Sequence, residues 1–255
     1  MPTVTLLAKA YNSFQVKELY ATLKSTFKDL KVEFEVCGVT NRDWIQLSVS
    51  GEDENVTLHY MDDKIGFCPT NLESVRKFST IHGRVIGLDK NRNELYVDIG
   101  VFSPDPVDAA VSLPRLQAQL ADGRKISLGK LVELFGLCKN LPLSVKVLSV
   151  DSDRSRVEAE LAEDQQNQYG NWIRSLLDRL QIIGASYGEI KSALAKTGFN
   201  RDVVAIEALG TFEYSMVCKL GTDAAGLIPR LGKNLGKAAF TIFNPRKVTE
   251  FFGEE

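Results

Sequence analysis

The 255-residue sequence predicts a multidomain α+β protein. Two observations carry this prediction: short runs in which apolar and polar residues alternate, as in strands, and longer runs in which apolar residues recur every three or four positions, as in helices. The order of these runs divides the chain into four parts. We expect an α+β domain over residues 1–74, a five-stranded barrel over 75–162, a helical hairpin connector over 163–199 and a small β-rich domain over 200–255.

The first domain is expected to place one helix beside a set of strands. TVTLLAKAY alternates like a strand, and Ser13 can cap a helix that continues to about Leu30. Three strand-like runs follow, namely KVEFEVCGV, WIQLSVSG and NVTLHYM, with turns at GEDEN and MDDK. The order of strand, helix and three-stranded meander indicates an α+β unit with an acidic surface.

The second part contains five strand candidates: STIHGRVIGL, ELYVDIG, VDAAVSL, LSVKVLSV and RVEAEL. DKNRN suits a hairpin turn, and SPDP suits a tight loop whose acidic residues lie at the surface. LPRLQAQLADG and SLGKLVELFGL, which lie between the third and fourth strands, have the pattern of short helices. Five strands with helical material in that position is the order of an OB-type barrel.

The third part is helical by pattern. An apolar stripe that includes Trp172 indicates one helix, and Ser186 with Glu189 forms a capping box that opens a second helix, closed by Gly198. A packed connector is favoured over a DNA-reading helix-turn-helix because the second helix has few basic residues. The last part offers the strands VVAIEAL, FEYSMVCKLG, DAAGLIPRLG and KAAFTIF, followed by a helix through PRKVTEFF.

One segment of the sequence occurs twice. DAAVSLPRL spans Asp108–Leu116 and DAAGLIPRL spans Asp223–Leu231, with six of the nine positions identical. Because proline ends the hydrogen bonding of a strand and suits the first turn of a helix, each copy is interpreted as a strand that turns into a helix at Pro-Arg-Leu. The flanking runs LYVDIG and MVCKLG also match in type, so we expect two related units, the second an OB-like half-repeat.

The net charge of the chain is only −2, but the charges are unevenly distributed. Residues 1–74 carry 7 Lys/Arg and 11 Asp/Glu, a net −4, whereas residues 215–247 carry 6 Lys/Arg and 1 Asp, a net +5. This asymmetry indicates a surface for an anionic partner, with a solvated charged surface as the alternative. The candidate phosphate-contacting residues are Arg115, Arg124, Lys125, Lys130, Lys219, Arg230, Lys233, Lys237, Arg246 and Lys247.

GRVIGLDKNRNELYVDIG and DAAGLIPRL resemble the RNA-binding OB domain named after ribosomal protein S-one. Gly83 and Val85 match the Gly-x-Val opening of that family, and residues 96–100 match its second strand. Residues 226–228 match its Gly-Leu-Ile third strand, in the other unit. The whole layout also resembles an archaeal family of unknown function that is cytosolic and has an OB-like centre.

Two base-contacting positions of the S-one family are not kept in this sequence. The first stacking aromatic falls on Asn93, and the third-strand histidine falls near Leu113 or Pro114 in one unit and on Pro229 in the other. The resemblance therefore implies a barrel that docks on structured RNA through charge and shape rather than one that stacks on free single strands.

The sequence contains no signature of catalysis. Of the two histidines, His59 is interpreted as a half-exposed strand residue, and no nucleophile, nucleotide-binding or metal-ligand pattern occurs. The four cysteines are widely separated and indicate reduced thiols in the cytosol. No apolar run approaches the roughly 20 residues of a membrane helix, and the start lacks a secretory signal. We expect a cytoplasmic protein that is not an enzyme and has no metal, cofactor or membrane partner.

The sequence favours a non-enzymatic RNA- or ribosome-binding factor that acts in translation. His82, Arg84 and Tyr96 are expected on the barrel face, with the basic residues named above on phosphates. The expected partner is ribosomal RNA or a ribosomal subunit, and ribosomal proteins and a second copy of the chain are further partners. Occupation of a subunit, as in hibernation or anti-association, is one concrete form of this hypothesis.

A protein adaptor, acting on the transcription machinery or in self-association, is the alternative. It is favoured by the near-neutral net charge and by the acidic N-terminal domain, which would repel nucleic acid. The expected contact anchors are the aromatic residues Phe212, Tyr214, Phe251 and Phe252.

Overall fold

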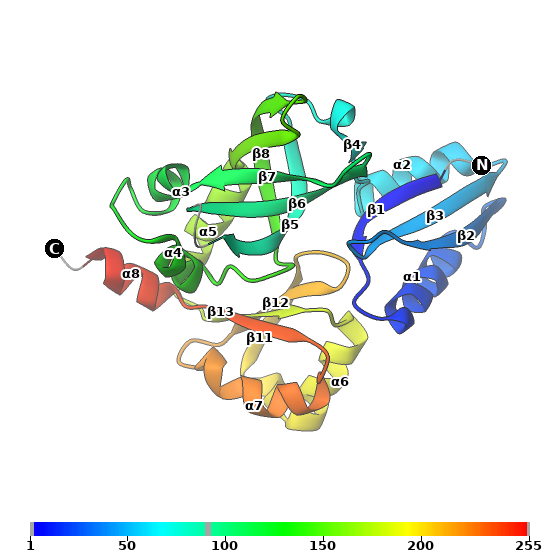
Figure 1. Ribbon diagram of the computed structural model, residues 1–255. Coiled ribbons are helices and arrows are strands. Elements are labelled where there is room, and N and C mark those ends of the chain that lie inside the picture. The colour runs from blue at the N-terminus through cyan, green and yellow to red at the C-terminus, as the bar shows by residue number, and fades with distance from the viewer. Residues whose placement is uncertain (1–2, 90–92, 254–255) are drawn as a thin grey trace.

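The computed structural model describes residues 3–89 and 93–253 (Figure 1). It confirms the α+β class and the multidomain organisation: a closed five-stranded barrel contacts an N-terminal and a C-terminal unit, each built from a sheet and helices. The predicted turn DKNRN lies mostly at residues 90–92, outside the described residues. Within the described part of the chain, no helix is long and apolar enough to cross a membrane.

The N-terminal unit is a three-stranded antiparallel sheet with two helices on one face. Its elements are β1 (Thr3–Lys9), α1 (Ser13–Thr26), β2 (Val32–Val39), β3 (Trp44–Gly51) and α2 (Glu54–Lys64), and the strand order is β1-β3-β2. Asn12, rather than the predicted Ser13, caps α1 by accepting hydrogen bonds from the backbone N–H groups of Phe14 and Gln15. Leu19 and Leu23 of α1 and Met61 of α2 close the core over the sheet.

NVTLHYM was predicted as a strand, and this prediction is wrong because the segment lies in α2. Thr57 and Met61 are fully buried, whereas Val56 is 63% and Tyr60 45% exposed, so burial follows a spacing of four residues rather than two. β3 already pairs with β1 and β2 on its two edges, which leaves this segment to cover a sheet face. His59 is therefore an exposed helix residue.

The central unit is the predicted OB-like barrel. Its strands are β5 (Thr80–Asp89), β6 (Glu94–Ser103), β7 (Val107–Ser112), β8 (Pro142–Asp151) and β9 (Arg156–Leu161). The pairing runs β5-β6-β7-β9-β8 and back to β5, and only the β7–β9 pair among these is parallel. Leu95, Val97 and Ile99 of β6 alternate into the barrel and are 0% exposed.

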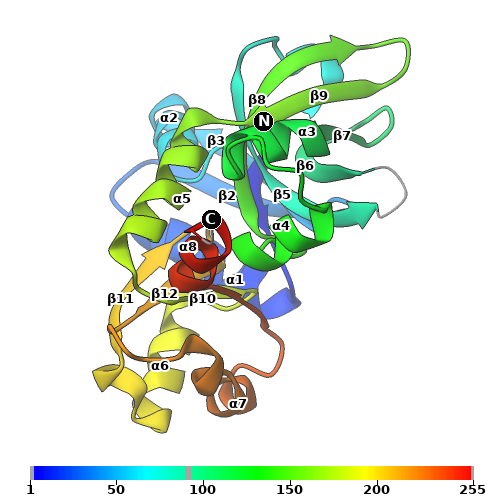
Figure 2. The same ribbon diagram turned by 90° about the vertical axis from the view of Figure 1, so that its left-hand side faces the viewer.

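Short elements complete the barrel. β4 (Thr70–Asn71) pairs with β6 and leads into a 3₁₀ turn (Leu72–Ser74), while α3 (Leu113–Leu120) and α4 (Leu128–Phe135) fill the predicted helical position between β7 and β8. Helix α5 (Glu163–Ser175) lies against the barrel (Figure 2), where Tyr169 packs edge-on against Phe135 with 5.2 Å between ring centroids.

The C-terminal unit is an open four-stranded antiparallel sheet in the order β11-β12-β10-β13. Its elements are β10 (Arg179–Ile183), α6 (Tyr187–Thr197), a 3₁₀ turn (Phe199–Arg201), β11 (Val203–Ala208), β12 (Glu213–Cys218), α7 (Ala224–Asn234), β13 (Ala239–Phe243) and α8 (Pro245–Gly253). Helices α6 and α7 pack on one sheet face, and residues such as Ile183 and Phe243 on the other face join the barrel core.

Two finer predictions need correction here. The segment 163–199 is not a helical hairpin, because β10, whose five residues are all buried, separates α5 on the barrel from α6 on the C-terminal sheet. The predicted capping box of Ser186 and Glu189 and the left-handed Gly198 at the end of α6 are both present. The C-terminal unit is β-rich as predicted, but its strands form an open sheet and not a second barrel.

The repeated nine-residue segment does not mark a structural repeat. Asp108–Ser112 belongs to β7 and is followed by α3, whereas Asp223 caps α7 and the rest of DAAGLIPRL lies within that helix. The prediction of two kindred barrels is therefore wrong.

A different repetition is present. The N- and C-terminal units both run strand, helix, strand, strand, helix, and in both sheets the third strand lies between the first two. The chain then returns to the edge of the first strand, as β13 beside β10 and as an antiparallel bridge between Phe67 and Leu6. This is the split βαβ order of ferredoxin-like domains.

Candidate nucleic-acid interface

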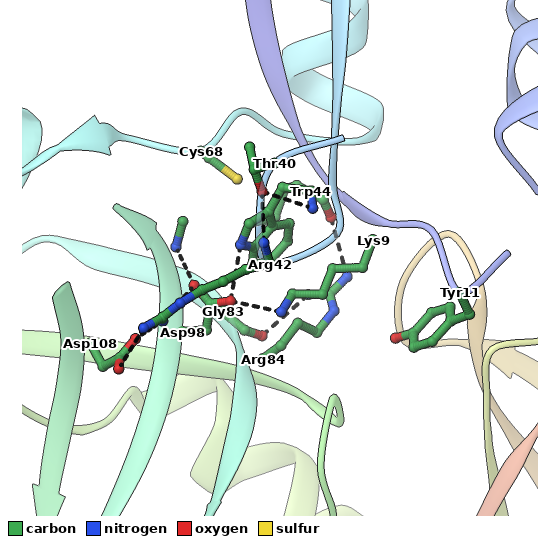
Figure 3. A network of polar contacts seen from close by, with 12 residues as sticks. Lys9, Tyr11, Thr40, Arg42, Trp44, Cys68, Gly83, Arg84, Asp98 and Asp108 are labelled. Atoms are coloured by element: carbon green, nitrogen blue, oxygen red, sulfur yellow. Dashed lines mark hydrogen bonds and ion pairs between the residues drawn. The ribbon is translucent and has the colours of Figure 1, made fainter. Parts of the chain in front are cut away.

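The barrel face formed by β6 and β7 corresponds to the face with which OB domains bind ligands, and here the N-terminal unit covers part of it (Figure 3). Lys9 of β1 lies 2.7 Å from Asp98 of β6, measured from Nζ to Oδ2. The indole Nε1–H of Trp44 donates to the same oxygen at 3.0 Å. Arg42 forms two hydrogen bonds with the carboxylate of Asp108 on β7.

A tight hairpin between β2 and β3 positions Arg42 and Trp44. The Oγ1 atom of Thr40 accepts hydrogen bonds from the backbone N–H groups of both residues, at 3.3 and 3.2 Å, and Asp43 adopts a left-handed backbone at φ 68°. The turn therefore projects a cation and an aromatic ring onto the barrel.

Asp98 is fully buried and each of its carboxylate oxygens is bonded. The second oxygen accepts from the backbone N–H of Gly100 at 3.1 Å, so three hydrogen bonds hold the carboxylate, and Arg42 forms an ion pair with the second oxygen at 3.6 Å. Gly83, on the neighbouring strand, has no room for a side chain, because a Cβ there would approach the Asp98 carbonyl oxygen to 2.6 Å. Gly83 and Asp98, which match the S-one family, thus serve packing and hold the N-terminal unit on the barrel. Burial raises the pKa of Asp108 even with Arg42 beside it.

A second layer of the network reaches the C-terminal unit. Arg84 of β5, 2% exposed, lies 3.1 Å from Glu213 of β12, measured from Nη2 to Oε2, and also donates to the backbone carbonyl of Leu7. The Tyr11 hydroxyl donates to the other oxygen of Glu213 at 2.5 Å, and burial together with Glu213 raises the pKa of Tyr11. Arg84 was predicted to contact RNA; the structure instead buries it at the junction of the three units.

The remaining outer face of the barrel carries carboxylates. The hydroxyl of Tyr96 donates to Glu94, which also accepts from Arg156 at 2.6 Å, and Arg115 lies 3.8 Å from Glu160. Tyr96 on β6, predicted for the barrel face, and Arg115 at the start of α3, predicted as a phosphate contact, thus lie among acidic residues that repel a phosphate backbone.

His82 lies at the surface of β5, where its Nδ1 atom is 2.7 Å from the Oγ atom of Ser144. It lines a pocket of about 500 Å³ between the three units, to which Arg84 also contributes.

Three of the predicted cations lie with two aromatic rings of α8 where the turn between α3 and α4 meets that helix. Arg124 lies over the ring of Phe252 at 5.7 Å from its centroid, and Lys130 of α4 lies over Phe251 at 5.3 Å. Lys125 is exposed beside them. We call these five residues the α8 surface.

Two rings on α8 have different roles. Phe252 packs against the barrel core and anchors the helix, whereas Phe251 is 36% exposed and meets Phe252 edge-on at 5.2 Å. Lys247 is one helical turn before Phe251 and lies on the same side of α8. Lys130 also contacts Glu133 at 3.1 Å, so part of its charge is compensated.

The other predicted cations are spread over the C-terminal unit. Arg230 on α7 lies over Phe199, 4.9 Å from the ring centroid. Burial raises the pKa of Asp178, and the nearby charges of Arg246 and Lys247 at the start of α8 partly offset this rise. The exposed cations on and around α7 are Lys219, Arg230, Lys233 and Lys237. The two Pro-Arg-Leu arginines therefore lie on unrelated surfaces.

No metal centre emerges from the geometry of the described residues. Among residues 3–89 and 93–253, no group of three or more His, Cys, Asp or Glu side chains could hold a metal ion. Burial raises the pKa of Cys68 to about 12 and that of Cys218 to about 11, so these thiols are protonated and poor nucleophiles at neutral pH.

Three family models match the chain in succession: the DUF2110 N-terminal domain at residues 3–70, the DUF2110 central domain at 76–173 and the DUF2110 C-terminal domain at 177–243. The chain belongs to the DUF2110 family. In this DUF2110 chain the buried ion pairs connect all three matched domains, since Lys9 and Arg42 lie in the first, Arg84 and Asp98 in the second, and Glu213 in the third.

Comparison with solved structures gives partial likenesses. The crystal structure of a protein from vaccinia virus (Wisconsin strain) matches with 22% identity and a TM-score of 0.24, over 34% of this chain and 89% of that one. A chain of the a/eIF2alpha–aDim2p–rRNA complex from Pyrococcus horikoshii OT3 matches with 11% identity and a TM-score of 0.27, over 49% of this chain and 64% of that one. No curated protein matches the chain.

Sequence reasoning missed most of the buried network. The sequence analysis did not single out Lys9, Trp44 or Glu213. Lys9 could have been recognised as a candidate buried residue, because it follows Thr5 and Leu7 at the two-residue spacing of a strand face. A lysine at a position that alternates with apolar residues predicts a buried partner of opposite charge.

Proposed function

We propose that this protein is a non-enzymatic RNA-binding factor that acts in translation and contacts ribosomal RNA through the α8 surface. The observation that carries the proposal is that Lys130 lies over the exposed ring of Phe251 and Arg124 over the neighbouring ring of Phe252, with Lys125 exposed next to Arg124 in the chain. Of the places where the structure puts the predicted cations, this one combines positive charge with an open aromatic ring.

The chemistry of the α8 surface suits a nucleic-acid backbone with unpaired bases. Arginine and lysine neutralise phosphates and release counterions, and an aromatic face stacks with a base of any identity. Lys247, one turn away from Phe251, extends the positive charge along the helix. Ribosomal RNA offers both paired regions and unstacked loop bases.

The covered faces of the barrel and of the C-terminal sheet support the choice of α8. The β6–β7 face of the barrel is partly occupied by Arg42 and Lys9, and the C-terminal sheet packs its second face on the barrel. A partner that binds without separating the units must use the outer surface.

The proposal includes the setting and the partners. Ribosomes are cytoplasmic, and four free cysteines fit a reducing compartment. We further propose an archaeal source, as the resemblance implies, and a place on a ribosomal subunit that blocks its association. The further proposed partners are nearby ribosomal proteins and a second copy of the chain.

Charge reversal provides the test. We expect the triple variant Arg124→Glu, Lys125→Glu, Lys130→Glu to lower affinity for ribosomal RNA about 100-fold at ~0.1 M salt and to reduce the slope of log affinity against log salt by about 2. Cosedimentation with ribosomal subunits and RNA titration at several salt concentrations measure both quantities.

The matched control reverses the same number of charges on the C-terminal unit, on and beside α7. Arg230→Glu, Lys233→Glu, Lys237→Glu is expected to retain at least about a third of wild-type affinity, because only long-range attraction is lost. Equal losses in the two triple variants, or a salt slope near zero for the wild type, contradict the proposal.

A protein adaptor remains the second candidate, because one groove favours it. About 490 Å³ of mainly apolar space lies between α1, α2 and the start of α6, and it is lined by Tyr60, Tyr187 and Tyr214. Phe212, predicted as an anchor, is only 3% exposed and packs inside the protein. Tyr187→Ala distinguishes the two functions: it weakens capture of a protein partner under the adaptor function and leaves RNA affinity unchanged under the first.

A further inference from the structure

We infer that the pocket between the three units binds one nucleobase. The pocket holds about 500 Å³ and is lined by β1 and the end of α2, by β5, β8 and α5 of the barrel, and by residues 208–211 of the C-terminal hairpin. A volume of this size suits a small ligand. The inference rests on the proposed function only for the source of the base, which is either RNA or a free nucleoside.

A relay of hydrogen bonds fixes the polar groups at one wall. Gln165, which is buried, accepts from the Ser144 backbone N–H at 3.0 Å and donates to the Oε1 atom of Gln168 at 2.8 Å. The Nε2 atom of Gln168 is thereby oriented as a donor. The Nδ1 atom of His82 is engaged with the Ser144 hydroxyl, so its Nε2 atom is left for a ligand.

Arg84 also lines the pocket, but its polar atoms are held inside the protein. Its two terminal nitrogens bond to Glu213 and to backbone carbonyls, but its Nε–H is buried and has no partner among the described residues. Arg84 is therefore a wall fixed in place, and the hydrogen-bonding groups open to a ligand are those of His82 and Gln168.

The charges of the lining exclude a strongly anionic ligand. Arg84 is paired with Glu213, and Lys64 is paired with Asp63 at 2.9 Å, while Asp62 contributes a further carboxylate. Leu7, Ile65 and Leu209 supply apolar walls.

A ligand that matches such a lining is neutral and flat, with apolar faces and a hydrogen-bonding edge. A nucleobase has this chemistry, whereas a phosphate or a fatty chain has not. Any phosphates that accompany the base stay outside the pocket.

The test uses isothermal titration with adenosine, guanosine, cytidine and uridine, and with ribose as the probe that lacks a base. We expect saturable heat with at least one nucleoside and none with ribose. His82→Ala and Gln168→Glu, the latter retaining the acceptor for Gln165, are each expected to weaken that binding about tenfold, while His59→Ala on exposed α2 leaves it unchanged. Melting curves verify that each variant is folded.

Absence of heat with all four nucleosides, equal binding of ribose, or unchanged binding in both pocket variants overturns the inference. RNA titration with His82→Ala identifies the source: a tenfold loss assigns the base to RNA, and an unchanged affinity assigns the site to a free nucleoside. The triple variant of the α8 surface retains nucleoside binding in either case. If the protein binds a nucleoside but not RNA, the proposed function is wrong and the nucleobase pocket is supported. If it binds RNA but no nucleoside, the nucleobase pocket is wrong and the proposed function is supported.

Discussion

Asp108–Leu116 and Asp223–Leu231 share six of nine residues and nevertheless adopt different structures. In the first, the strand β7 continues to Ser112 before a helix starts with Pro114 in its first turn. In the second, the aspartate is a helix cap and proline lies inside the helix. The comparison teaches that a short identity leaves the local conformation open.

Burial explains the difference. Ala109 and Val111 alternate into the barrel and are 0% exposed, as a strand requires. In the second segment Ala224, Leu227 and Leu231 are buried at spacings of three and four residues, as a helix requires. The first segment also pairs with β6 and β9, whereas the second covers a sheet whose strand positions are already filled.

The largest effect should come from proline at the shared second alanine. Ala110→Pro removes a backbone donor from a strand paired on both edges and should lower the free energy of unfolding by about 4 kcal/mol or more. Ala225→Pro lies in the first turn of α7 and loses only the 3.0 Å hydrogen bond to Asp223, at a cost of about 1 kcal/mol. Urea unfolding measures both, and equal costs would refute the strand–helix distinction.

An effect of intermediate size is expected when the residues at the first differing position, Val111 and Gly226, are exchanged. Val111→Gly removes a fully buried side chain from a strand and should cost about 3 kcal/mol. Gly226→Val, the reverse change, places a Cβ in an exposed position where its nearest neighbour, a carboxylate oxygen of Asp223, is 3.9 Å away. Its effect should stay within about 0.5 kcal/mol. A cost for Gly226→Val as large as that for Val111→Gly would contradict the burial argument.

The smallest effect concerns the shared aspartate. Asp223→Ala removes a helix cap and should cost about 1 kcal/mol, with faster amide hydrogen exchange confined to the start of α7. Asp108→Ala removes the partner of Arg42 and should cost about as much. Its faster exchange should appear in the hairpin between β2 and β3, far away in sequence. Exchange that increases around β7 alone would show that Asp108 acts locally.

The parts of the fold that could be predicted depend on nearby residues. The barrel strands, the helices between β7 and β8, and the capping box of α6 were recognisable from alternation and cap residues. Helix α2 was missed because Val56, Leu58 and Tyr60 alternate with polar residues as in a strand, while the buried pair Thr57 and Met61 is visible only against the sheet. β10 was missed because a short apolar run has no periodicity that separates strand from helix.

The residues of the candidate site could be predicted from the sequence, but their meeting could not, because it depends on residues far apart in the chain. Composition pointed to Arg124, Lys125 and Lys130, and aromatic content to Phe251 and Phe252, but for two competing functions. Their meeting requires that α8, over a hundred residues later, pack beside α4. No local pattern contains that information.

By itself the sequence determined the α+β class, the barrel order and the two ends of α6, because these follow from preferences that act within a few residues. Only the tertiary structure decided whether Asp-Ala-Ala begins a strand or a helix, and whether Arg84 contacts solvent or Glu213. The physical reason is that burial sets these outcomes: a charge or a backbone donor is removed from water only where a distant part of the chain supplies its partner.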